Sequence, residues 1–231
     1  MKQFCTIIAG LFLFSYSSQA QSLIDDLKAV SSVLDTAKSV KIQVVCKVYS
    51  KKGGDLVSSI NTGITKKGKM SVSLFDNLEI FTNEKYGVYV DKENESIMVV
   101  SKSKHAARLN SMGDKHMNEF VSWMKKQQTK VDFKPVLISE EAGIRSYSVT
   151  SLDDLKELIV SINVTNHTIE KISYEYVESS QQKQHYILLD YTKFLINSKE
   201  IDLDQKDYYI QQSGKFLPGN KYKSYSISTD L

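Results

Sequence analysis

The run from Lys41 to Val100 constrains the fold more than any other part of the sequence. Short segments with an apolar residue at every second position alternate with glycine-containing or charged breaks. Because successive side chains of a strand point to opposite faces, each segment predicts a half-buried strand and each break a hairpin turn. The apolar face of the first segment comprises Ile42, Val44, Cys46 and Val48. The run therefore predicts an antiparallel meander with an apolar face that needs a cover.

Residues 1–20 have the pattern of a secretory signal. Lys2 precedes an apolar core from Phe4 to Phe14, and small residues end at Ala20. This core is shorter than the roughly 20 residues that a membrane-spanning helix needs. We therefore expect cleavage after Ala20 and export of the protein.

The mature chain, residues 21–231, has the composition of a single domain with a large core. The full sequence contains two prolines and no low-complexity linker, which argues against several domains. Its formal net charge of +3 is too small to favour nucleic acid as a partner. Once the signal is removed, Cys46 is the remaining cysteine, so it has no intramolecular disulfide partner and is expected to be a buried thiol.

An amphipathic helix is predicted over residues 22–40. Its apolar stripe, at three- and four-residue spacing, comprises Leu23, Leu27, Val30 and Leu34. Ser22 is a candidate N-cap, and Asp25 and Asp26 lie in the first turn, where the helix dipole favours acids. Adjacent helical residues do not face each other, so a dipole role is favoured over a metal site or an acid–base pair.

A second amphipathic helix is predicted in mid-chain, over residues 115–128. Its apolar stripe comprises Met117, Phe120, Val121 and Met124. The two methionines are adaptable side chains that tolerate changing neighbours. Two interpretations stay open, an ordinary core helix and a movable lid over a pocket.

Strands resume after this helix. The alternating segments cover residues 134–141, 143–151, 155–165, 169–180 and 184–194. Residues 201–227 predict a final strand or two and an extended tail, because Pro218-Gly219 marks a turn. The predicted class is α+β, mainly antiparallel β, with one helix at the start and one inserted in mid-chain.

The sequence contains little that indicates catalysis. The four histidines have no spacing typical of a metal site, and there is no nucleophile elbow, phosphate-binding glycine loop or paired cysteine motif. We predict no catalytic residue, metal or cofactor, although an enzyme built on His116 with Asp114 and Glu119 is an alternative. Asp202 and Asp204 are expected on a solvated strand edge, and the Lys66-Lys67 pair in a hairpin turn.

Two segments give the chain a resemblance to a known family. EIFTNEKYGVYVDKENESIMVV, residues 79–100, and GITKKGKMSVSL, residues 63–74, are similar to strand–turn–strand segments of the LolA-like periplasmic lipoprotein carriers. The order of signal, helix, meander, helical insertion and second strand run also resembles that family. The resemblance implies an incomplete (half) β-barrel closed by a helical lid. It also implies a periplasmic location and an apolar cavity for lipid or lipoprotein acyl chains.

The same resemblance implies that an inner-membrane transporter delivers the cargo and an outer-membrane receptor accepts it. An arginine on an early strand holds the lid in that family, and the matching position here is Lys67, or Lys66. Lysine lacks the planar guanidinium fork, so the latch differs. Relatives of the fold also include sensor modules, so a sensor or scaffold that binds an envelope protein without lipid is the alternative.

The carrier hypothesis predicts which residues line the cavity. On the sheet side these are Ile42, Val44, Val48, Val72, Leu74, Ile80, Val88 and Val90, and on the lid Met117, Phe120, Val121 and Met124. A shift of one residue in a strand would exchange its two faces. The protein is expected to be a monomer.

Overall fold

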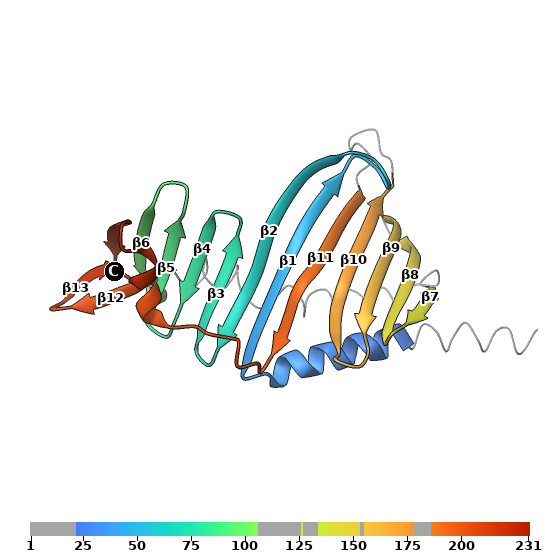
Figure 1. Ribbon diagram of the computed structural model, residues 1–231, viewed down its shortest axis with the longest axis horizontal. Helices are drawn as coiled ribbons and strands as arrows, with labels where there is room; N and C mark the ends of the chain where they lie inside the picture. The colour runs from blue at the N-terminus through green and yellow to red at the C-terminus, as the bar shows by residue number, and fades with distance from the viewer. Residues whose placement is uncertain (1–21, 106–125, 127–133, 153–154, 178–185) are drawn as a thin grey trace, which may run out of the picture. The chain divides into compact units, whose positions relative to one another are not determined.

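The structure is a computed structural model that describes residues 22–105, 126, 134–152, 155–177 and 186–231 (Figure 1). The predicted signal, residues 1–20, lies outside the described residues. So does most of the predicted mid-chain helix, residues 115–128, including its whole apolar stripe Met117, Phe120, Val121 and Met124, and the alternative enzyme cluster of Asp114, His116 and Glu119.

The first run of the sequence forms a meander of strands. It comprises β1 (Ser39–Tyr49), β2 (Leu56–Lys67), β3 (Met70–Phe75), β4 (Leu78–Thr82), β5 (Tyr86–Asp91) and β6 (Ser96–Ser101). The second run comprises β7 (Val136–Glu141), β8 (Ile144–Leu152), β9 (Leu155–Asn163), β10 (Thr168–Tyr176) and β11 (Tyr186–Ile196). The C-terminal segment contains η1 (Gln205–Asp207), β12 (Tyr209–Gln212), β13 (Lys215–Pro218), η2 (Asn220–Tyr222) and β14 (Ser226–Asp230).

Twelve strands form one sheet in the order β14-β6-β5-β4-β3-β2-β1-β11-β10-β9-β8-β7. The registers from β2 to β6 and from β7 to β11 are antiparallel, and β14 lies parallel to β6. Within the described residues the two end strands, β14 and β7, do not pair, so the sheet is open. This confirms the mainly antiparallel class and the open sheet order that an incomplete barrel requires.

The chain divides into two compact units. Unit 1 consists of the described residues within Met1–Asp35, Cys46–Ser59 and Met117–Asp190, and unit 2 of those within Thr36–Val45, Ile60–His116 and Tyr191–Leu231. The strands β1, β2 and β11 each contribute residues to both units. Each unit has its own apolar core.

The core of unit 1 lies between the N-terminal helix, residues 22–36, and the sheet (Figure 1). The helix buries Leu23, Ile24, Leu27 and Val30. The facing strands bury Tyr147, Val149, Leu158, Val160, Ile162, Ile169 and Ile172. Tyr147 is opposite Val160, which is opposite Ile172, so the registers bring these side chains to one face.

The predicted helix, residues 22–40, is too long at its C-terminal end. The amide Oδ1 of Asn197 accepts hydrogen bonds from the backbone N–H groups of Lys38, at 2.8 Å, and Ser39, at 3.2 Å. Val40 is buried in β1. The helix ends at residue 36 because the following backbone is held in the sheet, which periodicity alone does not reveal.

The core of unit 2 is covered by the C-terminal segment. On the sheet it contains Val72, Phe81, Val88, Val90, Ile97 and Val99, and on the segment Leu203, Tyr208, Tyr209, Phe216 and Tyr222. The Phe81 and Tyr208 rings stack with centroids 4.6 Å apart and an interplanar angle of 16°. Residues 201–227, predicted as a final strand or two and an extended tail, do contain strands. The segment folds back onto the sheet, because five large apolar side chains outweigh the cost of ordering it.

Two smaller predictions in unit 2 were wrong. Lys66 and Lys67 belong to β2, and the turn follows at Gly68, whose φ is +59°. Asp204 caps η1, where its side chain accepts from the Lys206 N–H at 2.9 Å, so it does not lie on a strand edge.

A buried carboxylate ties the C-terminal segment to β4. Glu79 is 7% exposed, accepts a hydrogen bond from the Tyr222 hydroxyl, and lies 3.2 Å from Lys92 Nζ and 3.5 Å from Lys221 Nζ. Burial acts to raise the pKa of Glu79, but the Tyr222 hydroxyl and the two ammonium groups outweigh it, and the pKa falls below its ordinary value of 4.5. The charged form of Glu79 therefore stabilises the fold.

This pKa shift predicts how stability depends on pH. A lowered pKa contributes stability above the ordinary value of 4.5 and loses it as the pH falls through the folded-state pKa. The free energy of unfolding, measured with urea from neutral pH to about pH 3, should fall in acid, and less steeply in Glu79→Gln. Parallel curves for the variant and the wild type would contradict this assignment.

Candidate functional site

The faces of β1 and β2 follow from their contacts in unit 2. The Gly68 N–H donates to the Lys38 carbonyl at 3.2 Å, and a Cβ on Gly63 would lie 3.3 Å from Gln43 Cα. Antiparallel strands with these two contacts place Ile42 opposite Ile64, with both side chains on the same face.

The strand registers then show which side chains of the other strands of the meander lie on this face. Ile64 is opposite Ser73, and Ser73 is opposite Ile80. Ile80 therefore shares the face of Ile42 and Val44, and it packs with Tyr89 and Val100. This face carries a row of half-buried apolar side chains, the unit 2 patch, which comprises Ile42, Val44, Ile64, Phe75 and Leu78.

The predicted lining residues of unit 2 do not share one face. Four of them lie opposite the unit 2 patch: Val72, Leu74, Val88 and Val90. Three of these, Val72, Val88 and Val90, pack against the aromatic side chains of the C-terminal segment. Alternation could not separate the faces here, because a strand covered on both sides is apolar at consecutive positions, as in Val88-Tyr89-Val90.

A second row of half-buried apolar side chains lies in unit 1. Ile172 is opposite Leu189, and Tyr174 is opposite Ile187. The Tyr49 and Tyr186 rings lie 6.0 Å apart, so Tyr49 shares the face of Tyr186. Cys46 and Val48, at the alternate positions of β1, therefore share the face of Ile187 and Leu189. The unit 1 patch comprises Cys46, Val48, Tyr174, Ile187 and Leu189. Its face is the one that carries the N-terminal helix, since Leu189, Ile172, Val160 and Tyr147 follow one another across the sheet.

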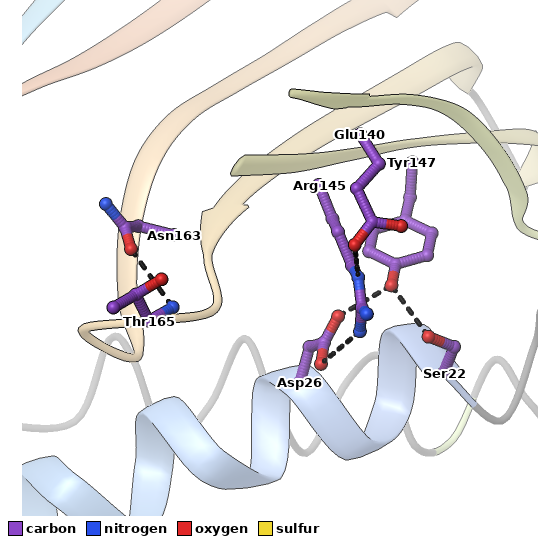
Figure 2. Close-up of polar contacts among 7 residues, drawn as sticks. All are labelled: Ser22, Asp26, Glu140, Arg145, Tyr147, Asn163 and Thr165. Atoms are coloured by element: carbon purple, nitrogen blue, oxygen red, sulfur yellow. Dashed lines mark hydrogen bonds and ion pairs between the residues drawn. The ribbon is translucent and has the colours of Figure 1, made fainter. Parts of the chain in front are cut away.

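A polar cluster fastens the N-terminal helix to this face (Figure 2). The Tyr147 hydroxyl donates to Asp26 Oδ2 at 2.6 Å and lies 2.8 Å from the Ser22 hydroxyl. Arg145 Nη1 is 3.5 Å from Asp26 Oδ1, and its Nε donates to Glu140 at 3.0 Å. We call these five residues the helix clamp.

The electrostatics of the clamp favour the neutral form of Tyr147. Burial, and then its hydrogen bond to Asp26, raise the pKa of Tyr147 to about 12. The pKa of Arg145 is raised chiefly by its hydrogen bond to Glu140. Tyr147 is fully buried, whereas the Arg145 side chain is 31% exposed. The tyrosine hydroxyl therefore provides the buried part of the link, and the arginine provides its solvent-facing part.

The predicted latch residue has a different role in the described structure. Lys67 Nζ lies 3.7 Å from Asp202 Oδ1, with the two side chains 47% and 89% exposed. Such an exposed ion pair contributes little to stability. Whether Lys67 also contacts a lid is not tested, because the lid residues lie outside the described part of the chain.

The clamp is the feature that sequence reasoning missed. Asp26 was interpreted as a dipole residue, but its carboxylate binds Arg145 and Tyr147, more than a hundred residues away in sequence. Asp25 pairs with Lys28 within the helix, at 3.2 Å. One sequence pattern could have indicated this contact. Asp26 lies one helical turn after Ser22, beside the apolar Leu23-Leu27 stripe, so its side chain is on the half-buried side of the helix.

Two absences hold for the described residues. Among them, no three His, Cys, Asp or Glu side chains are arranged to hold a metal ion. No helix in the described ranges has the length and hydropathy that crossing a membrane requires.

Comparison with known proteins gives distant structural similarities. No protein-family model and no curated protein matches the sequence. An uncharacterised conserved protein from Thermus thermophilus is similar with a TM-score of 0.43 and 8% identity, over 90% of this chain and 99% of that one. A LolA superfamily protein from Nitrosomonas europaea has a TM-score of 0.29 and 13% identity, over 82% and 96%.

Lipoprotein LppX from Mycobacterium tuberculosis has a TM-score of 0.37 and 10% identity, over 79% of this chain and 99% of that one. The resemblance to LolA-like proteins that the sequence predicted thus recurs as a distant structural similarity at low identity. It concerns the fold and assigns no cargo.

The helix clamp predicts different effects for two adjacent carboxylates. Asp26→Ala should lower the free energy of unfolding by about 1–3 kcal/mol, because the buried Tyr147 hydroxyl loses its carboxylate acceptor and Arg145 loses one of its two acidic partners. Asp25→Ala is the matched control and should cost less than about 0.5 kcal/mol, since its ion pair with Lys28 is exposed. Urea unfolding gives both values, and hydrogen exchange of residues 22–36 should accelerate only in Asp26→Ala. Equal effects of the two substitutions would contradict a stabilising role of the helix clamp.

Proposed function

We propose that this protein is an exported, non-enzymatic carrier of the periplasm. It shields lipoprotein acyl chains or lipids on the apolar face of its sheet, for transfer to the outer membrane. The cargo comes from an inner-membrane transporter and passes to an outer-membrane receptor. The location and the two partners follow from the signal-like N-terminus and the family resemblance of the sequence.

The observation that carries the proposal is the incomplete burial of β1 and its neighbours. Among the strand residues of β1 only Val40 is buried, and β2 and β11 contain no buried residue. In contrast, β4, β5 and β9 bury most or many of their apolar side chains. The apolar residues that remain half-buried on β1 are Ile42, Val44, Cys46 and Val48.

The chemistry of both patches suits acyl chains. The unit 1 patch contains no charged side chain, and its polar atoms are the Cys46 thiol and the Tyr174 hydroxyl. Burial raises the pKa of Cys46, so the thiol is neutral. The unit 2 patch consists of four aliphatic side chains and one aromatic side chain, Phe75. Burial of apolar surface contributes about 25 cal/mol per Å², or about 0.8 kcal/mol per methylene, so a long acyl chain binds without a charged anchor.

The helix clamp suits a cover that must stay attached to the sheet. The N-terminal helix lies on the face that carries the unit 1 patch, and its polar link to the sheet is Asp26 with Arg145 and Tyr147. The helix clamp and the unit 1 patch share no side chain, so these hydrogen bonds do not use the side chains that would contact cargo. The carrier therefore keeps its cover while cargo enters.

Substitutions on both faces of β1 test this proposal. Val44→Asp changes the unit 2 patch and Val48→Asp the unit 1 patch, while Val45→Asp changes the other face of the same strand and is also half-buried in the wild type. A buried carboxylate opposes an acyl chain. Mass spectrometry of organic extracts, and titration with a fluorescent fatty acid, should show at least about tenfold weaker binding for the two patch variants only.

Circular dichroism shows whether each variant is folded. Equal lipid content in all three folded variants and the wild type would contradict the carrier function. Lipid loss in Val45→Asp alone would indicate that the cargo binds the opposite face of the sheet.

A further inference from the structure

Two adjacent lysines at the end of β2, Lys66 and Lys67, lie on opposite faces of the sheet, because successive side chains of a strand point to opposite sides. Lys67 is exposed and pairs with Asp202 of the C-terminal segment. Lys66 is half-buried and shares the face of Ile64, which is the face of the unit 2 patch. The two lysines are therefore placed for different roles.

The strand registers identify the neighbours of Lys66 on this face. The contacts that fix β2 against β1 place Val40 opposite Lys66. On the other side Lys66 is opposite Ser71, and Ser71 is opposite Thr82. Val40 is 5% exposed, whereas the three polar side chains are half-buried. Lys66, Ser71 and Thr82 therefore form one row across β2, β3 and β4, which we call the polar row.

The polar row can donate several hydrogen bonds to an anion. Ser71 Oγ and Thr82 Oγ1 lie 2.8 Å apart, so one hydroxyl donates to the other. This hydrogen bond uses one of their two protons, and the second can be donated to a further acceptor. The Lys66 ammonium has three N–H donors, so it can bind an anion while it also contacts a group of the chain. The row thus combines hydrogen-bond donors with a positive charge.

Apolar side chains follow the polar row along the strands. The next row on this face contains Ile42, Ile64, Ser73 and Ile80, and the row after it Val44, Thr62, Phe75 and Leu78. The Thr62 hydroxyl donates to the Leu74 carbonyl at 2.9 Å, so its polar atom is satisfied by the backbone. Among the described residues of β1 to β4 in unit 2, Lys66 is the only charged side chain on this face. The face therefore has one charged end and an apolar remainder, which matches the polarity of an amphiphile.

We propose that Lys66 binds the anionic head of the cargo, a carboxylate or a phosphate, while the acyl chain lies along the unit 2 patch. This inference rests on the proposed carrier function and narrows its cargo to an anionic amphiphile. A half-buried ammonium has lost part of its hydration, and an anion compensates for this loss more strongly than it would in bulk water. The unit 2 patch then supplies affinity for the chain, and Lys66 selects the head.

Competition between probes of one chain length tests the choice of head. A neutral fluorescent dye, N-phenylnaphthylamine, is bound to the purified protein and displaced at neutral pH by dodecanoic acid, dodecyl phosphate or dodecanol. In Lys66→Gln the apparent Kd of the two anions should rise about tenfold, because a charged hydrogen bond is lost, and that of dodecanol should not change. Ser71→Ala should weaken the two anions about threefold and leave dodecanol unchanged.

Two further variants separate the charge of Lys66 from its place in the strand. Lys66→Arg keeps the charge and should retain the affinity for both anions. Lys67→Gln is the matched control on the opposite face and should leave all three probes unchanged. Circular dichroism shows whether each variant is folded.

A larger loss for dodecanoic acid than for dodecyl phosphate would identify a carboxylate head, and the reverse a phosphate head, and either result supports the proposal. Equal losses for the anions and dodecanol in Lys66→Gln would indicate a structural role of Lys66 and overturn it, as would no loss for either anion. In both of these cases displacement of the dye by dodecanol would leave the carrier function standing. A wild type that binds neither the dye nor any probe would overturn the carrier function as well.

Discussion

A sheet that is apolar on both faces needs a cover on each, and the rest of this structure depends on that requirement. In unit 2 the C-terminal segment folds back and covers one face with Leu203, Tyr208, Tyr209, Phe216 and Tyr222. In unit 1 the N-terminal helix covers a face with Leu23, Ile24, Leu27 and Val30. The two covers come from segments far apart in the sequence, residues 22–36 and residues 203–222. The apolar side chains of β1, Ile42, Val44, Cys46 and Val48, are only half-buried, and such side chains are the ones available to a ligand.

Each cover is held by the same combination of groups. On the helix, the Asp26 carboxylate accepts from the Tyr147 hydroxyl and lies beside the Arg145 guanidinium. On β4, the Glu79 carboxylate accepts from the Tyr222 hydroxyl and lies beside two lysines. A tyrosine brings a large apolar ring into the core and still satisfies a carboxylate at its tip. A single side chain therefore contributes both the packing and the orientation of each cover.

Much of the fold was predictable from local patterns, and the reason differs between elements. The strands from β1 to β6 and from β7 to β11 were visible because turn residues separate short alternating runs. The faces of β4 and β5 were not, since Val88, Tyr89 and Val90 are buried at consecutive positions. The return of residues 201–231 to the sheet and the Asp26–Tyr147 contact join residues far apart in sequence, and no local pattern encodes such contacts. The lid predicted at residues 115–128 stays a prediction.

The parallel pairing of β14 with β6 bears on how the protein is made. Residues Ser226–Asp230 hydrogen-bond next to Ser96–Ser101, and both compact units are assembled from separated segments of the chain. Neither unit can complete its core until long after its first strands have been synthesised. Contacts of such long range slow folding and leave early strands exposed. In the export that we propose, a chain that crosses a membrane unfolded would meet this delay on the far side, where the last residues to arrive close unit 2.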